Sequence, residues 1–130
     1  MSFKDWENEW ERLIEEGALS DEENELLKSF HKRLLSDLKS TEATIALGAD
    51  SPQLNALDEA IYYEKLGTFS NAALINMLIN NGNLIYPNRK IGRIEKGYEA
   101  NFFITDSSPI EDLSELKYKK TLIKNGIILN

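Results

Sequence analysis

The sequence predicts a mixed α/β fold, and two features of its pattern support this class. Over most of residues 4–86, apolar residues recur at spacings of three and four, which is typical of amphipathic helices. From Pro87 onward the pattern changes to one typical of strands. A short apolar stretch at residues 43–47 interrupts the helical part and is predicted to be a strand. The expected order is therefore two helices, a strand, two helices and four strands.

The first two helices are predicted over residues 4–16 and from Ser20 to about Lys39, joined by a short loop. The segment Ser20 to Glu23 has the sequence of a capping box, in which the serine hydroxyl accepts from the amide three residues on. The apolar face of the first helix is Phe3, Trp6, Trp10, Leu13 and Ile14. The apolar face of the second is Leu26, Leu27, Phe30, Leu34 and Leu38. The two tryptophans, one helical turn apart, favour a core or docking face.

The strand predicted at residues 43–47 is apolar on both faces, as in a parallel sheet that is buried on both sides. A short helix should follow over residues 56–63 and end at Gly67. Ser70 is expected to cap a further helix, with a turn at Gly82 after it. A lone buried strand needs parallel neighbours, and the chain has no other strand of this kind. The sequence therefore looks like the end of a larger domain.

Two strands are predicted within residues 90–106, joined by a turn at Lys96 and Gly97. The strongest local signal of the chain is the dipeptide Asn125-Gly126 between two apolar runs. It predicts a β-hairpin with a two-residue type I′ turn, because both turn positions need a positive φ that asparagine and glycine tolerate.

Composition and charge narrow the class of protein. The chain has 130 residues, 42% of them hydrophobic and 28% charged, as expected for a globular domain with a core. The absence of cysteine excludes disulfides and thiolate metal sites. A net charge of −7 without a basic cluster argues against nucleic-acid binding. No apolar run is long enough to span a bilayer, and the start is too acidic for a signal peptide, so we expect a cytoplasmic protein without membrane contact.

Asp50 is the principal candidate for a functional side chain. It follows directly on the predicted strand and precedes Ser51 and Pro52. In parallel α/β barrels, a carboxylate at the carboxyl end of a strand is often catalytic. An aspartate in a turn that bonds to the backbone after it is the alternative, and the residues alone favour this structural role.

The other polar residues do not complete a site. His31 is the only histidine, and a catalytic zinc site usually needs three protein ligands. Ser51 lacks a neighbouring base. Asp58 and Glu59 are adjacent on a helix and face different sides, so they are not a paired acid and base. Arg89 and Lys90 could bind an anion, although solvation in a turn is the simpler role.

The second half of the chain nevertheless contains a long ordered pattern. Its members are Ile91, Gly92, Ile94, Gly97, Ala100, Asp106, Pro109, Asp112 and Gly126. With these residues in this order, 66–129 resemble the C-terminal end of the metal-dependent amidohydrolases, in particular the imidazolonepropionase-like group. The segment 45–52, which contains Asp50, resembles the last barrel strand of the same family.

This resemblance implies a C-terminal fragment of a TIM-barrel amidohydrolase. Residues 1–86 would be the end of the (β/α) barrel, with helices and the last strand, and residues 87–130 part of a small antiparallel β-sandwich. In the family, the aspartate at the end of this strand binds the metal and acts as general acid and base. By position that residue is Asp50, both as metal ligand and as catalytic group.

The departures from the family pattern are equally informative. Ala49 stands where the family usually has threonine or serine, and the metal-binding histidines of the other strands are absent. We therefore expect no metal in this chain alone and no activity, and a divalent metal, zinc, in the full-length enzyme. The expected partners are the remainder of the barrel and a small-molecule substrate with a C–N bond. The alternative is a non-catalytic module that self-associates through exposed strand edges.

Overall fold

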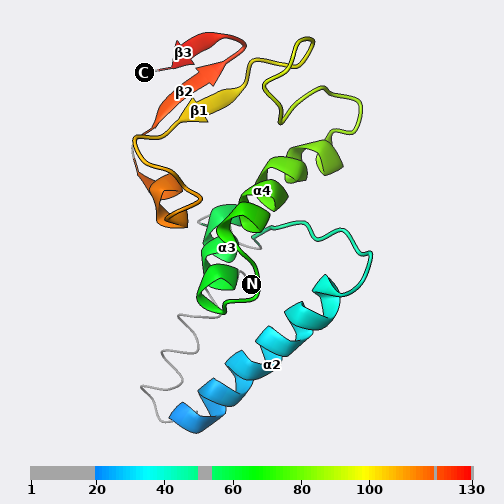
Figure 1. Ribbon diagram of the computed structural model, residues 1–130, viewed down its shortest axis with the longest axis vertical. Coiled ribbons are helices and arrows are strands. Elements are labelled where there is room, and N and C mark those ends of the chain that lie inside the picture. The colour runs from blue at the N-terminus through cyan, green and yellow to red at the C-terminus, as the bar shows by residue number, and fades with distance from the viewer. Residues whose placement is uncertain (1–19, 50–53, 119, 130) are drawn as a thin grey trace. The chain divides into compact units, whose positions relative to one another are not determined.

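The computed structural model describes residues 20–49, 54–118 and 120–129, and its contacts divide the chain into two compact units, Met1–Ser70 and Asn71–Asn130. The described residues form three α-helices, one 3₁₀ helix and a three-stranded antiparallel sheet (Figure 1). The mixed α/β class is therefore confirmed. The helix predicted over residues 4–16 lies outside the described residues. The domains 1–86 and 87–130 rest on the family resemblance and stay a prediction.

Helix α2 (Asp21–Lys39) begins at the predicted capping box. The Glu23 amide donates to Ser20 Oγ over 3.2 Å, and the Ser20 amide donates to Glu23 Oε2 over 2.8 Å. Two amides at the start of the helix, which have no partner within it, are satisfied in this way. Leu35 is buried on one side of α2, whereas the following residues, here called the α2 apolar row, are exposed: Leu26, Phe30, Leu34 and Leu38.

Residues 43–49 do not form the predicted strand. They run as irregular chain between α2 and α3, with Leu47 buried at 4% exposure and Ala43, Thr44 and Ala46 exposed. The prediction was wrong because apolar composition alone does not form a strand. A strand needs a neighbour for its backbone hydrogen bonds, and the described residues offer none here.

Helix α3 (Ala56–Lys65) has its own capping box, in which Asn55 Oδ1 accepts from the Leu57 amide and Asp58 accepts from the Asn55 amide. The chain turns at Gly67, as predicted. Ala60 and Tyr62 are buried on α3 and Phe69 just after it. With Leu35 and Leu47, these side chains form the core of the first unit.

Helix α4 (Asn71–Ile85) starts directly after Ser70 and buries Leu74 completely. The turn predicted at Gly82 is wrong, because Gly82 lies inside α4. Its missing side chain leaves room for Ile91, since a Cβ at this position would lie 3.0 Å from Ile91 Cδ1. The glycine is therefore a packing position and not a helix end.

The remainder of the second unit is a small sheet of strands β1 (Phe102–Ile104), β2 (Thr121–Lys124) and β3 (Ile127–Leu129). The strands pair antiparallel in the order β1-β2-β3, and the 3₁₀ helix η1 (Leu113–Lys117) lies between β1 and β2 in the chain (Figure 1). Of the two strands predicted within 90–106, the second corresponds to β1. Residues 90–101 contain the turn predicted at Lys96 and Gly97 but no strand. The prediction of the first strand was therefore wrong.

The predicted type I′ hairpin is confirmed. Asn125 has φ 51° and Gly126 has φ 76°, and the register pairs Lys124 with Ile127 across the turn. The sheet is largely uncovered in the described structure. Apolar side chains with exposures of 37% to 66% occur on all three strands: Phe102, Phe103, Ile104, Leu122, Ile127, Ile128 and Leu129.

In the described part of the chain, every helix is too short or too polar to cross a bilayer.

Candidate functional site

Asp50, the predicted metal ligand and catalytic residue, lies outside the described residues, and so does Ser51. The structure describes the chain on both sides, up to Ala49 and again from Leu54. The site can therefore be built from its flanking residues, which belong to the first unit.

Glu59 holds the chain two residues before Asp50. From the first half of α3, its Oε2 accepts a hydrogen bond from the Gly48 amide over 2.6 Å. Next to it, the Leu47 side chain is buried in the core of the unit. These two contacts fix the segment that leads into Asp50, one through the backbone and one through packing.

Tyr63 completes this arrangement from the next turn of α3. Its hydroxyl donates to Glu59 Oε1 over 2.6 Å, so that each oxygen of the Glu59 carboxylate accepts one bond. Burial raises the pKa of Tyr63, and the hydrogen bond and negative charge of Glu59 raise it further. The phenol is thus a neutral donor that orients the carboxylate, and not a proton donor for chemistry near pH 7.

Asp58 and Glu59 act separately, as predicted from their spacing. Asp58 caps its own helix through Asn55, whereas Glu59 reaches Gly48. The role of Glu59 was missed by the sequence analysis. The spacing of Glu59 and Tyr63, four residues apart on a helix, was the available signal.

We expect replacement of Glu59 by alanine to release the Gly48 segment. The Gly48 amide would lose its acceptor and the half-buried Tyr63 hydroxyl its partner, at a cost of about 1–3 kcal/mol of unfolding free energy. Hydrogen exchange of the Gly48 amide, measured by NMR, should accelerate strongly in Glu59→Ala. Lys65→Ala, an exposed change on the same helix, is the control and should leave this rate unchanged.

His31 lies apart from this segment and bonds to a tyrosine. Its Nδ1 lies 3.2 Å from the Tyr62 hydroxyl, which links α2 to α3. The His31 ring also lies near the rings of Phe30 and Tyr62, with centroid distances of 6.2 and 6.4 Å. Burial lowers the pKa of His31. The only histidine of the chain is therefore part of the packing between two helices.

This environment predicts a pH dependence of stability. Because the pKa of His31 is lowered in the folded state, the unfolded chain binds the proton first as the pH falls. The contribution of neutral His31 to the free energy of unfolding is complete above the ordinary histidine pKa of 6.5. It is lost as the pH falls from there toward the lowered pKa of His31 in the folded state. Urea unfolding at several pH values should show this loss, and His31→Gln should reduce it. An unchanged pH profile in the variant would contradict the assignment.

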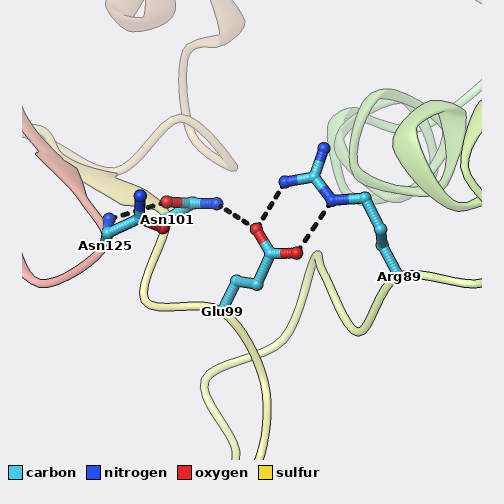
Figure 2. A network of polar contacts seen from close by, with 4 residues as sticks. All are labelled: Arg89, Glu99, Asn101 and Asn125. Carbon is cyan, nitrogen blue, oxygen red and sulfur yellow. Dashed lines mark hydrogen bonds and ion pairs between the residues drawn. The ribbon is translucent and has the colours of Figure 1, made fainter.

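A second polar cluster, in the other unit, joins the loop after α4 to the hairpin (Figure 2). Arg89 makes a two-point ion pair with Glu99, in which Nε donates to Oε1 over 2.8 Å and Nη2 donates to Oε2. Glu99 Oε2 also accepts from Asn101 Nδ2 over 2.9 Å. The Asn125 amide donates to Asn101 Oδ1 over 2.8 Å. Both carboxylate oxygens are therefore occupied.

This cluster has a structural role. The hydrogen bond from Arg89 lowers the pKa of Glu99, and the bond to Glu99 raises the pKa of Arg89. Arg89 is thus neutralised by Glu99, and neither of the roles predicted for it, anion binding or simple solvation, describes it. The Gly126 amide donates to the Ala100 carbonyl over 3.0 Å beside the cluster, so the hairpin turn is held at two consecutive residues.

No group of three or more His, Asp or Glu side chains within 20–49, 54–118 and 120–129 is placed to hold a metal ion. Comparison with known proteins gave no match to a family model, a curated protein or a solved structure.

Proposed function

We propose that this chain is the C-terminal segment of a metal-dependent amidohydrolase that hydrolyses amide or cyclic amide C–N bonds through a metal-activated water. The observation that carries the proposal is the ordered pattern from Ile91 to Gly126. Several residues of this pattern have specific roles in the backbone of the structure. This supports the interpretation of the pattern as the signature of a fold. Gly92 has φ 79° and contacts α4, and Asp112 caps η1. Ala100 accepts the hydrogen bond of Gly126.

The residues of this chain do not by themselves fit a metal centre. The single histidine is bonded to Tyr62, and the described carboxylates do not converge with it. The further ligands would come from the rest of the barrel, and this chain alone is inactive in the proposal. Its own contribution is Asp50, the metal ligand and general acid and base at the end of the last barrel strand.

The segment before Asp50 supports this role in a specific way. Leu47 and Gly48 are already held by the core and by Glu59, whereas Ala43, Thr44 and Ala46 are exposed. An apolar segment fixed at one end and largely exposed before it, with Ile45 half-buried, is suited to join neighbouring parallel strands. In the proposal, residues 43–47 become a strand once those neighbours are present, because they supply the missing hydrogen-bond partners.

Restoration of activity tests this proposal. The chain is mixed with an imidazolonepropionase-like amidohydrolase that has been truncated before its last barrel strand. We expect metal-dependent C–N hydrolysis to appear on mixing and to be lost with Asp50→Asn. Asp37→Asn, an exposed change on α2, is the matched control and should retain the activity. Restored activity that survives Asp50→Asn would contradict the role of Asp50.

A non-catalytic, self-associating module is the second candidate function. It is favoured by the exposed apolar sheet, in which the outer edges of β1 and β3 have no partner strand among the described residues. Unpaired apolar edges promote pairing with another chain. Sedimentation analysis separates the two candidates. A discrete oligomer that stays soluble and compact favours the module, whereas a monomer whose exposed surface binds a hydrophobic dye favours the segment of an enzyme.

A further inference from the structure

We draw no further inference here: the strongest candidate, the α2 apolar row with the surface hollow beside Leu26 and Phe30, carries none, because nothing in the structure shows what covers it.

Discussion

Replacing Leu74 with alanine is expected to lower the unfolding free energy of the second unit by about 2–5 kcal/mol. Leu74 is completely buried on α4, with 0% exposure. The loss combines the transfer energy of the removed methyl groups with the cavity that they leave. Few side chains are buried in this unit besides Leu74, namely Leu113 and Leu116 among the described residues. A core of this size has little capacity to absorb such a loss.

Urea unfolding followed by circular dichroism measures the effect of Leu74→Ala. Leu84→Ala is the matched control, because it makes the same change on the same helix at a side chain that is 48% exposed. We expect the control to change the stability by less than about 1 kcal/mol, since about half of this side chain is already in water. Equal losses in the two variants would show that Leu74 is not the centre of the core.

Alanine at Gly92 is the second change with a large expected effect. Gly92 has φ 79°, a conformation that costs a residue with a Cβ about 1–2 kcal/mol. The new Cβ would also lie 3.0 Å from Ile79 Cγ2 and 3.4 Å from the Ile79 carbonyl oxygen of α4. Crowding of this kind adds about 1–3 kcal/mol. The loop that follows α4 should therefore detach from the helix or shift.

Gly97→Ala separates the two causes. Gly97 has φ 90°, but the nearest atom to an added Cβ there is Lys90 Nζ at 4.0 Å. This variant should lose only the conformational part of the free energy. A larger loss for Gly92→Ala than for Gly97→Ala, measured by urea unfolding, is the expected result. The same loss for both would mean that the contact with Ile79 does not matter.

Local backbone chemistry was the part of the fold that could be predicted from the sequence. The Ser20 capping box and the Asn125-Gly126 hairpin are confirmed because each depends on a few neighbouring residues. In each case, a side chain or a glycine satisfies a geometric need within four residues. Signals of this kind do not require knowledge of the rest of the fold.

Features that depend on distant partners could not be predicted in this way. Residues 43–47 have the composition of a strand, but no neighbouring strand is present in the described structure to accept their hydrogen bonds. Gly82 resembled a helix end, but it lies within α4, where its missing side chain leaves room for the distant Ile91. The apolar runs gave no indication that the sheet would have exposed side chains on all three strands.

The candidate site was predictable to a similar extent. Asp50 could be selected by its position after an apolar segment, but its partners could not, and it lies outside the described residues. The contact of Glu59 with Gly48 spans eleven residues and depends on how α3 packs beside the chain. Arg89 was placed correctly in a turn, whereas its pairing with Glu99 depends on the path of the intervening loop.

The turn that closes the hairpin is also a site of slow chemical degradation. An asparagine followed by glycine is prone to deamidation, because the glycine nitrogen can attack the side-chain carbonyl with little steric hindrance, and asparagine is among the thermolabile residues. Here the Gly126 amide is engaged by the Ala100 carbonyl, and the Asn125 backbone is held by Asn101. We therefore expect deamidation of Asn125 to be slower in the folded chain than in the unfolded chain. Once the reaction occurs, the additional backbone atom of isoaspartate would end the pairing of β2 with β3.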